Sequence, residues 1–177
     1  MLMLTAVIVA LFTSAGEIDI NVDRMHAPET AANFLTYVRR GAFNGGSFFR
    51  TVRTHPDNQP KNRVKIDVIQ AGNRPNFTSG APLAFESTRQ TGLHHRDGTV
   101  SMARDTALNT ATTNFFICIG DQPSLDDGGG RSADRRGFAA FGQVVHGMDV
   151  VRAIHDAPHA EQALTPPIAI RRAEIRE

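Results

Sequence analysis

Residues 7–22 carry the sequence VIVALFTSAGEIDINV, in which two apolar stretches flank a short segment of small and polar residues. After the turn residues 13–16, apolar side chains alternate with polar ones at Ile18, Ile20 and Val22. Such alternation is typical of a β-strand with one buried face. Two strands joined by a tight turn form a β-hairpin, and we expect one here.

The apolar segment Met1–Phe12 also resembles the hydrophobic part of a signal peptide. However, no Lys or Arg precedes Arg24, so the positive region of a signal peptide is missing. The segment is also shorter than the roughly 20 residues that span a bilayer. We therefore expect it to belong to the fold. The expected location is the cytoplasm, or the periplasm if an export signal lies upstream and is removed.

The rest of the chain shows short strand patterns and two helix patterns. Residues 28–40 predict a helix that begins at Pro28 and ends just before Gly41, and a weaker pattern around 150–154 ends before Pro158. Strands are expected at residues 47–53, 64–70, 99–103, 114–119, 139–145 and 167–175. These patterns do not alternate as βαβ units would, so they predict a mainly β fold, an antiparallel barrel or sandwich. The length of 177 residues fits a single domain over 1–177.

Two segments between the strands predict loops. Residues 55–62 contain two Pro, two Asn and an Asp, which indicates an exposed loop. Residues 126–137, with the sequence DDGGGRSADRRG, predict a mobile surface loop. Its glycines do not form a phosphate-binding loop, because no Gly-Lys-Ser/Thr follows them.

Composition excludes several classes of protein. Nineteen basic and 18 acidic residues give a formal charge of +1, which argues against a nucleic-acid partner. Cys118 is the single cysteine and lies in an apolar run, so we expect a buried thiol and no disulfide. His155 and His159 are spaced like metal ligands on a helix, but Pro158 interrupts that helix. No metal, cofactor or membrane partner is expected.

An apolar and aromatic cluster with one charge remains to be explained. Phe48-Phe49-Arg50 lies in an expected strand, so alternation places Phe48 and Arg50 on one face and Phe49 on the other. From the residues alone, the phenylalanines are core and Arg50 is a surface charge. The accompanying motifs occur further along, at residues 69–72 (IQAG), 98–104 (GTVSMAR), 114–117 (NFFI), 125–126 (LD) and 141–148 (FGQVVHGM).

In this order, the motifs resemble those of the cyclophilins, and the resemblance runs from about Val7 to Ile170. It implies an eight-stranded antiparallel barrel capped by two helices, with a groove on its outside. It implies a peptidyl-prolyl cis–trans isomerase that assists protein folding, acts on proline-containing peptides and on unfolded or folding proteins, and works as a monomer without a cofactor. Arg50 matches the catalytic arginine. The substrate-binding residues would be Phe48, Gln70, Met102, Ala103, Asn114, Phe116, Leu125 and Phe138.

Several positions depart from the family pattern. Phe49 replaces a histidine, Asn114 a glutamine and Phe138 a histidine or tyrosine. Asp67 stands at the place of a pocket phenylalanine, and Ser124 at that of a tryptophan or phenylalanine. Two insertions separate Arg50 from Gln70 and Leu125 from Phe138. The alternative function is a module that binds proline-containing peptides with little or no catalysis, which Phe49, Asp67 and Asn114 favour.

Overall fold

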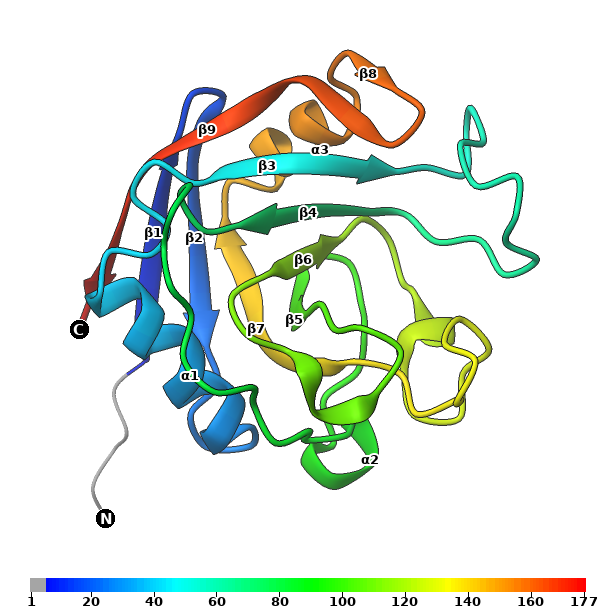
Figure 1. The fold of residues 1–177 in the computed structure, drawn as a ribbon, viewed down its shortest axis with the longest axis horizontal. Coiled ribbons are helices and arrows are strands. Elements are labelled where there is room, and N and C mark those ends of the chain that lie inside the picture. Colours follow the sequence, from blue (N-terminus) through cyan, green and yellow to red (C-terminus); the bar gives the residue numbers. More distant parts are fainter. Residues whose placement is uncertain (1–5) are drawn as a thin grey trace.

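The computed structural model describes residues 6–177 and shows a closed antiparallel β-barrel (Figure 1). Pairing of the first strand with the last closes the ring, which confirms the predicted eight-stranded barrel. A two-residue strand, β8 (His159–Ala160), pairs with β9 only. In spatial order the barrel strands are β1 (Val7–Thr13), β2 (Gly16–Val22), β7 (Ala139–His146), β5 (Thr99–Met102), β6 (Phe115–Cys118), β4 (Val68–Gly72), β3 (Ser47–Val52) and β9 (Ala163–Arg176).

The expected hairpin is present. β1 and β2 pair without interruption from Val7 opposite Val22 to Thr13 opposite Gly16. The inward side chains of this pair, among them Val9 and Ile20, are fully buried. The expectation that Met1–Phe12 is part of the fold therefore holds from Val7 onward, whereas residues 1–5 lie outside the described residues.

Two helices pack against the barrel at the predicted places. α1 (Pro28–Arg39) contacts β7 and β9, and α3 (Met148–His155) contacts β2, β3 and β4 (Figure 1). The sequence did not indicate three shorter elements: α2 (Thr88–Thr91) and the 3₁₀ turns η1 (Leu108–Thr110) and η2 (Pro123–Leu125). No helix within residues 6–177 combines the length and the apolar character needed to cross a membrane.

The strand expected at residues 64–70 begins later than predicted, at Val68. The cause is the buried side chain of Gln59, whose Oε1 accepts a hydrogen bond from the Ile66 N–H (3.2 Å). Its Nε2 donates to the Ile66 carbonyl (2.9 Å). This side chain satisfies the backbone of Ile66 as a neighbouring strand would, so the chain there needs no β-pairing.

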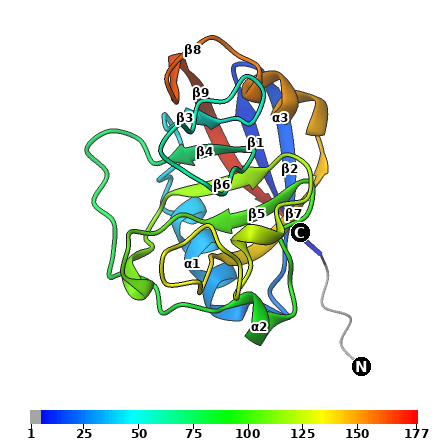
Figure 2. The ribbon, with the colours of Figure 1, turned by 90° about the vertical axis from the view of Figure 1, so that its right-hand side faces the viewer.

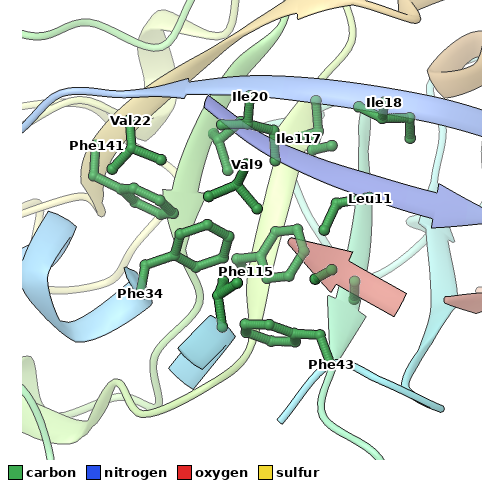
Figure 3. Close-up of a cluster of buried hydrophobic side chains, with 14 of the residues drawn as sticks. Val9, Leu11, Ile18, Ile20, Val22, Phe34, Phe43, Phe115, Ile117 and Phe141 are labelled. Carbon is green, nitrogen blue, oxygen red and sulfur yellow. The ribbon is translucent and has the colours of Figure 1, made fainter. Parts of the chain in front are cut away.

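Aromatic side chains fill the interior of the barrel (Figure 3). Phe115 on β6 lies at the centre, with its ring centroid 5.4 Å from that of Phe34 and 5.3 Å from that of Phe43, both close to edge-to-face. Phe141 lies 4.9 Å from Phe34. All four rings are at most 1% exposed. The barrel interior is thus a packed core, and any substrate must bind on the outside.

We predict that Phe115→Ala lowers the free energy of unfolding by about 3–5 kcal/mol, because it removes a ring that several others contact and leaves a cavity. Urea denaturation monitored by circular dichroism measures the change. Val145→Ala, at an exposed apolar side chain, is the control and should cost less than about 0.5 kcal/mol. A similar loss in both variants would contradict the central place of Phe115.

Candidate active site

A β-bulge in β3 decides where Arg50 points. Phe48 pairs with Ala71 of β4, but Arg50 pairs with Gln70, so Phe49 and Arg50 together lie opposite one residue of β4. The register shifts at the same point on the other side, toward β9. An extra residue reverses the side-chain alternation. Phe48 and Arg50 therefore face opposite sides of the sheet, and the prediction that they share a face was wrong.

Strand register aligns three polar and aromatic side chains on the outer face. Arg50 lies opposite Gln70, and Gln70 lies opposite Phe116 of β6. Directly paired residues project from the same face of a sheet. The barrel therefore presents Arg50, Gln70 and Phe116 as one row across β3, β4 and β6.

A second row of paired residues, on the inner face of the same strands, contains two residues that we predicted to bind substrate. Phe48 pairs with Ala71, Ala71 with Phe115, and Phe115 with Met102. Phe48 is 0% exposed and Met102 is 1% exposed, and both belong to the interior core. Neither lines the outer pocket, because each faces the inside of the barrel.

The outer row borders a pocket of about 170 Å³. A second apolar cluster, outside the barrel, supplies its walls, and the ring of Phe138 stands edge-on to that of Phe116 at 5.5 Å. Six of the residues named from the sequence meet here: Arg50, Gln70, Ala103, Phe116, Leu125 and Phe138. Four more were not predicted to be site residues: Ile66, Val68, Arg104 and Arg131.

Two glutamine side chains hold the guanidinium of Arg50. Its Nε and Nη2 donate to Oε1 of Gln162, at 2.9 and 2.7 Å, and its Nη1 donates to Oε1 of Gln70 at 2.8 Å. Burial lowers the pKa of Arg50. Within residues 6–177 no carboxylate forms an ion pair with it. Arg50 is thus fixed by neutral acceptors and keeps its full charge.

Two departures from the family pattern lie away from this pocket. Asp67 does not replace a pocket phenylalanine: its carboxylate accepts hydrogen bonds from the Thr54 N–H (2.9 Å) and hydroxyl (2.7 Å), and Ile66 and Val68 line the pocket instead. Asn114, expected to bind substrate, does not line the pocket either. Its Oδ1 lies beside Gly72, where an added Cβ would approach to 2.5 Å.

The second predicted loop borders the pocket through Arg131, and the first contacts Arg131 through Gln59. The two loops lie on the same side of the barrel, at the right of Figure 1 and facing the viewer in Figure 2. The second loop, expected to be mobile, is held by Arg104. The guanidinium of Arg104 donates to the Gly137 carbonyl (2.9 Å) and to both oxygens of Asp134 (2.9 and 3.0 Å). It also lies over the ring of Phe138, at 5.2 Å.

A buried histidine supports the pocket from behind. His95 is 1% exposed and stacks on Phe116 with ring centroids 5.9 Å apart. Its Nδ1 lies 2.6 Å from Oδ1 of Asp126, and its Nε2 lies 2.9 Å from Oγ of Ser101. Burial alone raises the pKa of a carboxyl group, but the hydrogen bonds from His95 and His94 outweigh it, so the pKa of Asp126 lies below its usual value.

Ser101, His95 and Asp126 are hydrogen-bonded in the order of a nucleophile, a base and a carboxylate, but Ser101 and His95 are 0% and 1% exposed, so a substrate does not reach the Ser101 hydroxyl. Cys118 is fully buried beneath the pocket, and burial raises the pKa of its thiol strongly, as the sequence led us to expect of a small buried side chain. No group of three or more His, Cys, Asp or Glu side chains within 6–177 is placed to hold a metal ion. His155 Nε2 instead lies 2.9 Å from the Val52 carbonyl.

Known proteins with similar sequences belong to one family. A family model described as cyclophilin-type peptidyl-prolyl cis-trans isomerase covers residues 8–175. Peptidyl-prolyl cis-trans isomerase A of Dickeya dadantii is 33% identical over 97% of this chain and 85% of that protein. Peptidyl-prolyl cis-trans isomerase B of Escherichia coli is 35% identical over 81% of this chain and 80% of that protein.

Solved structures show the same fold. A crystal structure of a Cryptosporidium parvum cyclophilin-type isomerase matches with a TM-score of 0.74 at 19% identity, over 97% of this chain and 98% of that one. The chain therefore belongs to the cyclophilin-type peptidyl-prolyl cis–trans isomerases. Its activity is the isomerisation of the peptide bond that precedes proline.

We predict that Asp126→Asn lowers the free energy of unfolding near neutral pH by about 1–3 kcal/mol, because the carboxylate is a charged hydrogen-bond partner of buried His95. The folded pKa of Asp126 lies below the unfolded value of about 3.9. The carboxylate thus stabilises the protein above that value, and this contribution is lost as pH falls through the folded pKa.

Urea unfolding of both proteins between pH 3 and 7 tests this prediction. The difference between wild type and Asp126→Asn should be largest at pH 5–7 and shrink below about pH 4. Asp105→Asn, at an exposed carboxylate, is the control and should show little difference at any pH. A constant difference for Asp126→Asn down to pH 3 would contradict the role of its charge.

Proposed function

We propose that Arg50 catalyses the rotation of a Xaa-Pro peptide bond whose proline ring occupies the pocket beside it. The observation that carries the proposal is the position of the Arg50 guanidinium beside the apolar wall that Phe116, Leu125 and Phe138 form on the outer face. Substrate binding by Phe116, Leu125, Phe138, Ala103 and Gln70 belongs to the same proposal.

The reaction requires neither a nucleophile nor a cofactor. Delocalisation of the nitrogen lone pair into the carbonyl group gives the bond a rotational barrier of about 18–20 kcal/mol. Both isomers are populated before proline, yet they exchange over tens to hundreds of seconds. A catalyst need only bind the twisted amide more tightly than either planar form.

The pocket has the size and lining that a proline ring needs. A cavity of about 150 Å³ with apolar walls accepts a benzene molecule, and this pocket measures about 170 Å³. Phe116 and Leu125 are 5% and 1% exposed, so their positions are set before substrate arrives. A ring held there fixes one side of the imide bond while the other side rotates.

Arg50 would act on the twisted state. A guanidinium has five N–H groups, and the bonds to Gln70 and Gln162 use three of them. The remaining N–H groups can donate to the proline carbonyl and toward the imide nitrogen, whose lone pair localises as the bond twists. A preorganised donor of this kind contributes about 3 kcal/mol, or roughly a hundredfold in rate.

The proposed substrates are proline-containing peptides and unfolded or folding proteins, which the enzyme would meet as a monomer. One of the Cryptosporidium parvum structures, with a TM-score of 0.73, was determined in the presence of the dipeptide Ala-Pro, which supports peptide binding on this fold. Within residues 6–177 the large exposed apolar side chains are Met25 and Val145 alone. So small an apolar surface favours a monomer.

We predict that Arg50→Ala lowers kcat/KM for a Xaa-Pro peptide at least tenfold through loss of the charged donor. Exchange spectroscopy by NMR measures the rate on a short peptide. Arg63→Ala, at the exposed arginine that follows the first loop, is the control and should retain wild-type activity.

The same assay separates an isomerase from a peptide-binding module, because a pure binder shifts the isomer ratio without accelerating exchange. Wild-type exchange no faster than that of the free peptide, together with a shifted isomer ratio, would favour the binding module. Equal rates in wild type and a folded Arg50→Ala variant would remove Arg50 from the mechanism.

We further predict that Gln162→Glu lowers kcat about tenfold even though Arg50 stays in place. The new carboxylate would pair with the guanidinium and offset the charge that stabilises the twisted amide. Ala160→Glu adds the same charge at an exposed position of β8 and is the control. An unchanged kcat in Gln162→Glu would show that the charge of Arg50 is not what the reaction uses.

A further inference from the structure

Arg131 reaches the pocket because the second loop folds back against the residues that precede it, Ser124 and Leu125. A Cβ on Gly129 would lie 2.3 Å from the Ser124 carbonyl oxygen, and one on Gly137 would lie 2.3 Å from that of Leu125. Only glycine fits both positions. Between them, the N–H of Arg131 donates to the Ser124 carbonyl (3.1 Å), which anchors its backbone next to the pocket residue Leu125.

The first loop fixes the guanidinium of Arg131. Its Nη1 donates to Oε1 of Gln59 (2.9 Å) and to the Val64 carbonyl (2.7 Å). Gln59 is 1% exposed and is itself held by the backbone of Arg53 and Ile66. The two loops therefore meet at this contact. Arg131 is a positioned side chain, and its Nε and Nη2 have no hydrogen-bond partner among residues 6–177.

Arg131 and Arg50 form an uncompensated pair of charges at one pocket. Neither has a carboxylate partner among residues 6–177, whereas Arg104 at the same pocket is paired with Asp134. Burial lowers the pKa of Arg131, and the positive charge of Arg50 lowers it further. Two like charges held together in a half-buried site favour the entry of a negative group.

We propose that Arg131 makes this pocket selective for substrates that carry a carboxylate side chain, Asp or Glu, directly before or after the proline. The inference rests on the proposed function of the pocket, because the proline ring brings its neighbouring residues to Arg131. A carboxylate there accepts charge-assisted hydrogen bonds from a guanidinium, which are stronger than those that a neutral amide accepts. Arg131 thus determines specificity, while Arg50 acts on the imide bond.

Two pairs of blocked peptides test the proposal: Ala-Glu-Pro-Ala against Ala-Gln-Pro-Ala, and Ala-Ala-Pro-Glu against Ala-Ala-Pro-Gln. Glu and Gln have almost the same shape and differ in charge. For at least one pair, kcat/KM from NMR exchange should favour the Glu peptide about five- to tenfold at 50 mM salt. The ratio of kcat/KM between the Glu and Gln peptides should move toward one at 1 M salt, where charges are screened.

In Arg131→Gln, the Glu-to-Gln ratio should fall to about one. Arg135→Gln removes the same charge from an exposed position of the same loop, outside the pocket, and should keep the wild-type ratio. Should Arg131→Gln fail to fold, the Nε–Hε resonance of Arg131 in the wild type provides the test. It should shift with the Glu peptide and not with the Gln peptide.

Equal kcat/KM for Glu and Gln peptides in both wild-type pairs would overturn the proposal, as would a preference that survives Arg131→Gln. Failure of the proposed function gives a different result in this assay: no peptide of either pair would exchange faster with the protein than without it. In that case, calorimetric binding of the same peptides decides the selectivity. Tighter binding of a Glu peptide, lost in Arg131→Gln, would support it, and equal binding would overturn it.

Discussion

The bulge in β3 is the constraint on which the site depends. It inserts one residue between Phe48 and Arg50, and so sends the first side chain into the barrel and the second out of it. Without the shift, a charged guanidinium would enter an interior lined with aromatic rings, where burying an unpaired charge is very costly. The same shift places Arg50 opposite Gln70, and so in line with Phe116.

Two apolar clusters lie on the two faces of the same strands, one stabilising the barrel and the other forming the substrate pocket. The inner cluster around Phe115 fills the barrel, and the outer cluster around Phe116 forms the pocket. Neighbouring residues of one strand thus belong to different clusters. Polar side chains position the pocket residues: His95 stacks on Phe116, and two glutamines accept hydrogen bonds from Arg50. The two glutamines are neutral, which suits Arg50 because its charge must be available to the substrate.

From alternation and turn residues, the sequence predicted an antiparallel barrel or sandwich, and the resemblance to the cyclophilins implied the closed eight-stranded barrel that the structure shows. The hairpin at 7–22 and both main helices follow from local patterns. The pocket was predicted in part: motif resemblance located Arg50, Gln70, Ala103, Phe116, Leu125 and Phe138, which meet there. Phe48 and Met102 were wrongly predicted to line the pocket. A run such as Phe-Phe-Arg gives no sequence signal for a β-bulge, and the face that a strand residue occupies depends on register.

The remaining site residues depend on long-range contacts that no local pattern contains. Gln162 reaches Arg50 from a hairpin more than a hundred residues away in sequence, and Arg131 depends on Gln59, a buried residue in a loop expected to be exposed. The central claim is that Arg50 donates to a substrate whose proline ring lies against Phe116 and Leu125. A crystal structure with a bound Xaa-Pro peptide tests it most directly. The account predicts the proline carbonyl about 3 Å from the guanidinium of Arg50, and a proline ring bound elsewhere on the barrel would contradict it.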